Sequence, residues 1–345
     1  MGEAFDYVQY HVDQAARHSA DARGKRVLVV GCNEGREVSL FLDTGAREAW
    51  GIDIIDEVGS GYPREHAHYL RMSAEAMDLD DGMFDVVFCL ATMEHISRPD
   101  AALPEISRVT APEGLLYVVS SPLWHSRYGH HKSDIFDVDR YPWIHLQFDA
   151  ETLKRMCSTG EIEYPESVED VDADIDYMMS SEHFNKRPAQ EYVRICSELE
   201  EVVIERNDLD LEPEPVLQLL QDGERAGLID QLGDPIELRA VTHTLVGWKV
   251  RRPRHIRARR ISASTTWRRW RARMSRASHA VVARRLGACE RRPAVSSRTD
   301  TQALSPFDAV QPTVVARPNE ARVAQDHGFE GKTLVAIGDL LWVGL

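Results

Sequence analysis

Four residues near the start of the chain are suited to holding a nucleoside: Gly31, Asn33, Gly35 and Asp53. The glycines interrupt the chain directly after a short apolar run, residues 26–30, and Asp53 ends the next such run. A glycine-containing loop between a buried strand and a helix lets backbone N–H groups approach a ligand, and a carboxylate ending the second strand can accept hydrogen bonds from ribose hydroxyls. These spacings predict a β-loop-α-β unit that binds a nucleoside.

The loop spacing also indicates which kind of nucleoside ligand fits. A dinucleotide fingerprint reads G-x-G-x-x-G, whereas Asn33 and Arg36 stand at the second and third glycine positions here. Asn tolerates left-handed backbone angles better than most residues, so we expect the loop to keep its shape. The pattern therefore favours a nucleoside without a pyrophosphate.

A second group of chemically capable side chains lies between residues 120 and 148, a segment rich in His, Trp, Tyr and Asp that lacks a clear period. His125, His130 and His131 are candidate general bases, because a neutral imidazole can take a hydroxyl proton near neutral pH. Each of them, taken alone, also fits a structural or surface histidine.

Metal ligation is the alternative chemistry for this segment, because His130 and His131 lie near Asp134, Asp137 and Asp139. Adjacent histidines point apart unless the backbone turns, and the spacing matches no compact metal motif. We therefore predict no metal site.

The elements that must position these residues are short apolar runs alternating with helical patterns. Strands are expected at residues 26–30, 49–53, 68–72, 84–90 and 115–120, followed by 202–206 and 240–250, and helices near 3–18, 149–160 and 188–199. This alternation predicts an α/β fold with a parallel sheet and helices on both faces. The positions after Val30, Asp53, Met72, Leu90 and Ser121 should then face one cleft, at the carboxyl ends of the strands.

In this order the motifs resemble those of the class I S-adenosylmethionine-dependent methyltransferases of the small-molecule, type 11-like kind. The loop at Gly31 and Gly35 is similar to their motif I. Further matches follow in family order: Gly51-Ile52-Asp53, Ser73-Ala74-Glu75, Phe84-Asp85-Val86-Val87, Thr92-Met93-Glu94-His95, and the segment 102–121. The resemblance is clear over residues 25–125 and weaker over 126–250, where residues 240–250 resemble the antiparallel closing strand of a Rossmann-like sheet.

The resemblance implies that the cofactor is S-adenosyl-L-methionine. It implies cofactor contacts at Gly31, Cys32, Asn33, Gly35, Asp53, Ile54, Ser73, Ala74, Glu75, Leu90 and His95. It also implies a methyltransferase domain over residues 1–250, in which residues 161–235 form a variable acceptor or lid region. The chain departs from the family pattern at Val29 and Ser73, where acids are common.

The function expected from these features is methyl transfer to an oxygen or nitrogen of a small-molecule or glycan-like acceptor. A nicotinamide-dependent oxidoreductase is the enzymatic alternative, and Asn33 and Arg36 disfavour it. A non-catalytic scaffold with a methyltransferase-like fold is the other alternative, for which Val29 and Ser73 are the hints.

Charge is distributed unevenly along the chain, whose formal net charge is −15. Residues 1–248 hold 21 basic and 49 acidic residues, whereas residues 249–292 hold 16 basic residues and a single acid. An acidic body is a poor electrostatic match for nucleic acid, so we expect no nucleic-acid partner for the catalytic domain.

The last third of the chain is expected to be a basic amphipathic segment, residues 251–292, followed by a linker and a short apolar stub, residues 293–345. Within it, residues 265–286 predict a basic helix with an apolar stripe that docks on an anionic surface such as a membrane. A helix that binds a partner protein, or an arginine-rich segment without fixed structure, fits the same pattern.

The five cysteines are scattered, without a C-x-x-C pair, and residues 1–10 contain no apolar signal-like run. Neither is there a run of about 18 apolar residues. These features lead us to expect a cytoplasmic protein, with peripheral membrane contact through its tail.

Overall fold

The structure of the protein is a computed structural model that describes residues 5–250. The expected basic segment 251–292, its helix 265–286 and the expected linker 293–345 lie outside the described residues.

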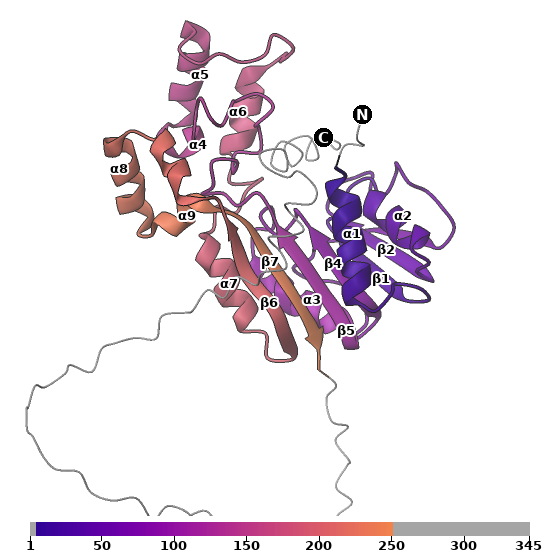
Figure 1. The fold of residues 1–345 in the computed structure, drawn as a ribbon. Helices are drawn as coiled ribbons and strands as arrows, with labels where there is room; N and C mark the ends of the chain where they lie inside the picture. The colour runs from indigo at the N-terminus through magenta and orange to yellow at the C-terminus, as the bar shows by residue number, and fades with distance from the viewer. Residues whose placement is uncertain (1–4, 251–345) are drawn as a thin grey trace, which may run out of the picture. The chain divides into compact units, whose positions relative to one another are not determined.

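A seven-stranded sheet forms the centre of the described part, in the order β3-β2-β1-β4-β5-β7-β6 (Figure 1). Strands β1 to β5 are parallel, and β7 runs antiparallel to both β5 and β6. The strands are β1 (Arg26–Val30), β2 (Glu48–Asp53), β3 (Ala67–Arg71), β4 (Phe84–Leu90), β5 (Thr110–Ser120), β6 (Val202–Leu211) and β7 (Ala240–Lys249). The expected parallel sheet with an antiparallel closing strand is confirmed.

Helices cover both faces of this sheet because its strands are apolar on both sides. Along β1, Val27 and Val29 belong to one apolar cluster, and Leu28 and Val30 to the cluster on the opposite face. The first cluster is covered by α1 (Tyr7–His18) and α2 (Arg36–Asp43), and the second by α3 (Pro99–Val109) and α7 (Ala189–Ser197). This alternation follows from the period of two along a strand, and it holds the loops at the strand ends in place.

The remaining helices gather near one end of the sheet (Figure 1). Helices α5 and α6 pack around buried residues such as Leu153 and Met178, whereas η1, α8 and α9 pack around Trp143. The sequence marks α5 clearly, because Asp149 caps its N-terminus and Gly160 ends it in a left-handed conformation. Their bounds are α4 (Ile144–Gln147), α5 (Ala150–Thr159), α6 (Val171–Met179), η1 (Glu214–Leu219), α8 (Asp222–Leu232) and α9 (Pro235–Arg239).

Strand β6 is longer than expected, because it continues to Leu211 instead of ending near residue 206. Its second half pairs with β7 through residues such as Asn207 and Asp208, whose types give no strand signal. The pairing partner, rather than local propensity, extends this strand.

No helix among residues 5–250 combines the length and the apolar character needed to cross a membrane.

Candidate functional site

A pocket of about 500 Å³ opens at the carboxyl ends of β1 to β4. The residues that directly follow these four strands all line it: Gly31, Ile54, Met72 and Ala91. The segment directly after Ser121 does not line it, because the Ser121 N–H turns inward and donates to Glu94 Oε1 at 3.0 Å. The fifth strand contributes later residues of its loop instead, His131 and Lys132.

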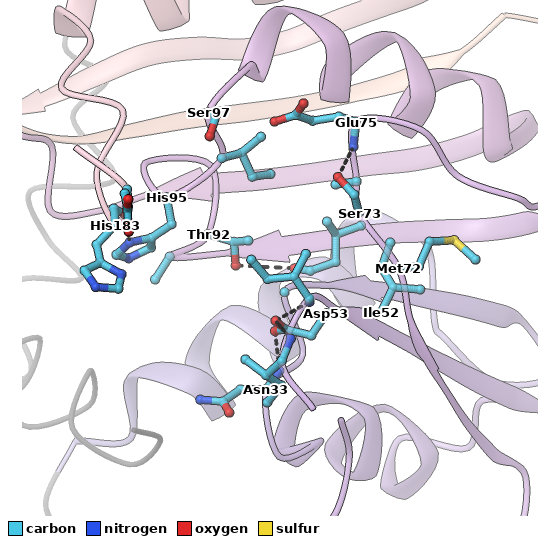
Figure 2. Close-up of a pocket in the computed structure, with 18 of the residues that line it drawn as sticks. Asn33, Ile52, Asp53, Met72, Ser73, Glu75, Thr92, His95, Ser97 and His183 are labelled. Atoms are coloured by element: carbon cyan, nitrogen blue, oxygen red, sulfur yellow. Dashed lines mark hydrogen bonds between the residues drawn. The ribbon is translucent and has the colours of Figure 1, made fainter. Parts of the chain in front are cut away.

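Asp53, at the end of β2, organises the side of the pocket that faces the glycine loop. Its Oδ2 accepts a hydrogen bond from the Asn33 N–H at 2.8 Å, and its Oδ1 accepts one from the Ile54 N–H at 2.7 Å (Figure 2). A longer bond of 3.4 Å from the Ile55 N–H also reaches Oδ1. A carboxylate has about four acceptor sites, so these three bonds orient Asp53 and still leave capacity for a ligand hydroxyl.

Left-handed backbone conformations shape the loop that lies between β1 and α2. Gly31, Asn33 and Gly35 have φ angles of 74°, 45° and 99°, so the expectation that Asn33 takes a glycine-like conformation is confirmed. The turn brings the backbone of Gly31 and Asn33 to the pocket wall. Gly31 is required for a further reason, since a Cβ there would lie 2.2 Å from the Thr92 side chain.

Gly31→Ala is therefore expected to lower the free energy of unfolding by about 2–4 kcal/mol, combining overpacking with the cost of a left-handed alanine. Gly160→Ala is the matched control, because Gly160 has a similar φ of 76° but no heavy atom within 4 Å of the added Cβ. Urea denaturation of both variants separates the two costs. Equal losses at the two positions would show that Thr92 moves freely and that the packing argument is wrong.

Most of the residues assigned to the cofactor from sequence come together in this pocket, and three do not. Those that line it are Gly31, Asn33, Asp53, Ile54, Ser73, Ala74, Glu75 and His95. Cys32 instead packs beneath the loop against Gly51, Gly35 packs against the Tyr69 ring, and Leu90 is buried in the core. The individual contacts of these residues with the cofactor stay predictions.

The three candidate bases are placed differently. His131 lines the pocket, whereas the other two do not: His130 is fully buried near His145, and His125 lies 3.2 Å from the Glu237 carboxylate. Burial lowers the pKa of His131 well below its usual value and that of His130 to about 3, so both imidazoles are neutral at neutral pH.

Four polar or aromatic residues that sequence reasoning did not assign to the site also line the pocket. They are Thr92, Lys132, Tyr177 and His183, and Figure 2 shows His183 beside His95. Lys132 Nζ lies 4.8 Å from the centre of the Tyr177 ring and 2.8 Å from Asp174. Lys132 could have been assigned to the site from sequence, because it directly follows His131. Nothing in the sequence places α6, which carries Tyr177, beside this loop.

Comparison with known proteins gives a match between residues 28–118 and the family model described as a methyltransferase domain. An ubiquinone biosynthesis O-methyltransferase from Methylococcus capsulatus is 30% identical over 119 residues, which cover 32% of this chain and 46% of the relative. A tRNA U34 carboxymethyltransferase from Idiomarina loihiensis is 28% identical over 113 residues, covering 30% of this chain and 35% of the relative. The chain thus spans about half or less of the length of these curated relatives.

Among solved structures, an S-adenosylmethionine-dependent methyltransferase from Mesorhizobium loti superimposes with a TM-score of 0.41 at 13% identity. The superposition covers 69% of this chain and all of that one.

The glycine loop, the β2 carboxylate and the family match together identify residues 28–118 as a methyltransferase domain of the class I S-adenosylmethionine-dependent kind. The cofactor of such a domain is S-adenosyl-L-methionine. The pocket fits that molecule in size and chemistry, since ligand pockets span roughly 300–1,000 Å³ and the wall offers a carboxylate, exposed loop backbone and apolar side chains such as Ile52 and Met72.

Proposed function

We propose that this protein transfers the methyl group of S-adenosylmethionine to an oxygen or nitrogen atom of a small-molecule acceptor, glycans included. The observation that carries the proposal is the composition of a single pocket. Its glycine-loop side presents Asp53 and Asn33, and its other side presents His131, Lys132 and Tyr177. Methyl transfer requires the acceptor nucleophile to lie close to the methyl group and in line with the methyl–sulfur bond. An acceptor in this pocket would be surrounded by polar and aromatic side chains.

Oxygen is the favoured acceptor atom for two reasons. Relatives are named for O-methylation in ubiquinone biosynthesis. The ring of His131, which lines the pocket, also offers an Nε2 lone pair that can accept a hydroxyl proton. A tRNA acceptor, suggested by the name of another relative, is disfavoured by the formal charge of −28 carried by residues 1–248.

The test of this proposal has two stages. Calorimetry should detect binding of S-adenosylhomocysteine to the full chain, and incubation with methyl-labelled S-adenosylmethionine and a panel of phenols, amines and sugars should label one acceptor class. Tight binding of NADH without binding of S-adenosylhomocysteine would contradict the proposal. Cofactor binding without transfer to any acceptor, purified cell extract included, would favour a scaffold.

His131→Gln should lower the turnover on the acceptor so identified by about 10²- to 10⁴-fold, because a group that promotes proton loss from the acceptor is removed. The affinity for S-adenosylhomocysteine should stay close to that of the wild type. His66→Gln is the control, since His66 is exposed on the loop before β3 and does not line the pocket. Full turnover in the His131 variant would mean that positioning alone drives the transfer.

A further inference from the structure

One group of side chains at the edge of the pocket has the composition of a metal site: Glu94, His95 and His131. One ligand atom of each lies within 4.8 Å of those of the other two. Glu94 and His95 belong to the segment after β4, and His131 belongs to the loop after β5. The two histidine rings are 5.0 Å apart between centroids and nearly perpendicular. Two segments that are distant in the chain therefore converge on one point.

Two atoms of this group are buried without a hydrogen-bond partner: Glu94 Oε2 and His131 Nε2. Leaving a buried polar atom unsatisfied costs about 1–3 kcal/mol, and more for a charged group. Folds rarely keep buried polar atoms unsatisfied without a reason, and a bound ion is one of the recognised reasons.

The hydrogen bonds made by the other atoms of these side chains determine which atoms are available. His95 Nδ1 lies 2.8 Å from the His183 carbonyl oxygen, and His131 Nδ1 lies 2.8 Å from the Gly129 carbonyl oxygen. A carbonyl only accepts, so both rings donate from Nδ1 and carry a lone pair on Nε2. Metal-binding histidines are usually oriented in this way, by a backbone carbonyl on the nitrogen that does not bind the ion.

The carboxylate is held by the same kind of arrangement. Glu94 Oε1 accepts from the Ser121 N–H at 3.0 Å, and the Glu94 carbonyl oxygen accepts from the Asn185 N–H at 3.0 Å. The Nε2 lone pairs of His95 and His131 and the Glu94 carboxylate oxygen are all acceptors, so they cannot hydrogen-bond to one another. They need a proton or a cation between them.

The backbone of His131 provides independent support. Its φ of 58° is left-handed, a conformation that costs a non-glycine residue about 1–2 kcal/mol. Such conformations concentrate at functional sites, where the surrounding structure maintains them. Here the conformation turns His131 towards His95, although its neighbour His130 is directed into the core.

We propose that Glu94, His95 and His131 bind one divalent transition-metal ion of the zinc type. Two imidazole nitrogens and one carboxylate oxygen are the ligand set of catalytic zinc sites that keep a fourth position open, whereas Mg²⁺ prefers oxygen ligands alone. Zinc–ligand distances of about 2.0–2.2 Å place ligand atoms roughly 3.4 Å apart, so the three side chains have to close by about 1 Å or a little more around the ion.

The open position of such an ion would lie at the edge of the pocket, because His95 and His131 line it. The role of this position in the reaction rests on the proposed function. An acceptor hydroxyl at this position would ionise more readily, as water does on zinc, and release its proton to solvent. Its oxygen then bonds to the methyl carbon as the methyl–sulfur bond breaks. His131 acts in that case as a ligand, rather than as the base.

The test measures metal binding directly on the full chain stripped with a chelator. Calorimetry with Zn²⁺ should show one tight equivalent, and Co²⁺ should develop a visible absorption band that Zn²⁺ abolishes and excess Mg²⁺ does not. Glu94→Gln, His95→Gln and His131→Gln should each weaken that equivalent by more than about 100-fold, beyond the 10- to 100-fold typical of losing an outer partner. His130→Gln is the matched control, since its Nε2 is equally buried and unpartnered but lies outside the group.

Far-UV circular dichroism of the same samples reports folding, and binding of S-adenosylhomocysteine to the wild type separates this inference from the proposed function. If the cofactor binds and no tight zinc equivalent appears, the metal site is refuted and the methyltransferase proposal stands. If zinc binds equally well to the wild type and to all three ligand variants, it occupies another part of the chain and the inference fails. Loss in the three variants with retention in His130→Gln supports it.

Discussion

Asp53→Ala is expected to weaken the binding of S-adenosylhomocysteine by about 10- to 150-fold. The loss corresponds to the roughly 1.5–3 kcal/mol of hydrogen bonding to a charged group, at 1.4 kcal/mol for each factor of ten. Asp53 is assigned the ribose hydroxyls, and its carboxylate also accepts the N–H groups of Asn33 and Ile54. The substitution is therefore expected to remove a ligand contact and to loosen the glycine loop.

Isothermal titration calorimetry measures this effect, and Asp56→Ala serves as the control. Asp56 lies three residues further along the same segment, is mostly exposed and pairs with Arg71, so its loss should change affinity less than twofold. Asp53→Asn should fall between the two, because it keeps the size and one acceptor oxygen but loses the charge. Wild-type affinity in Asp53→Ala would show that the β2 carboxylate does not contact the cofactor.

Glu212→Ala is expected to lower the free energy of unfolding by about 3 kcal/mol or more, the largest expected stability loss besides that at Gly31. Arg127 donates from Nε and Nη2 to Glu212 Oε1 at 3.0 and 2.8 Å, and the two side chains are only 11% and 6% exposed. Removing one member of a buried pair leaves the other charge without compensation, which typically costs about 3–5 kcal/mol. Asp139 also contacts Arg127 and partly compensates its charge, so we expect a loss of stability near the lower end of this range.

The double variant Arg127→Met/Glu212→Leu should be more stable than Glu212→Ala alone, because a buried pair can be replaced by apolar side chains at little cost. Glu198→Ala provides an exposed comparison, since the Arg194–Glu198 pair is more than half exposed on both sides and should contribute less than about 1 kcal/mol. Chemical denaturation of the four proteins measures these differences. Equal losses for Glu212→Ala and Glu198→Ala would contradict the burial argument.

This ion pair has a functional consequence because of its position. Arg127 belongs to the loop after β5 that carries His131, and Glu212 directly follows β6 at the edge of the sheet. The pair therefore links the loop that carries His131, on the acceptor side of the pocket, to the edge strand β6. We expect Glu212→Ala to reduce turnover as well as stability, with S-adenosylhomocysteine affinity affected less.

The cofactor side of the pocket was predictable from sequence because its residues are close in the chain and depend on local conformation. A left-handed turn needs glycine or a residue such as Asn33, and an acid such as Asp53 at a strand end is visible as a pattern. The parallel order of the strands then follows from the alternation of strands and helices, and it brings residues after β1 to β4 to one edge. Cys32, Gly35 and Leu90 do not line the pocket, because adjacency in a motif does not reveal which neighbour faces the cavity.

The acceptor side depended on contacts between distant segments. Nothing in the spacing of three histidines indicates that His131 turns towards the pocket while His130 and His125 do not, since a left-handed backbone at one residue decides it. The long-range pairing of Arg127 with Glu212 and the carbonyls of Gly129 and His183 are equally invisible in sequence. The sequence by itself determined the fold class, because that rests on local periodicity, and it indicated the cofactor through the resemblance of its motifs to those of a known family. Only the tertiary structure decided which side chains surround the acceptor position, because that requires loops from β4, β5 and α6 to meet.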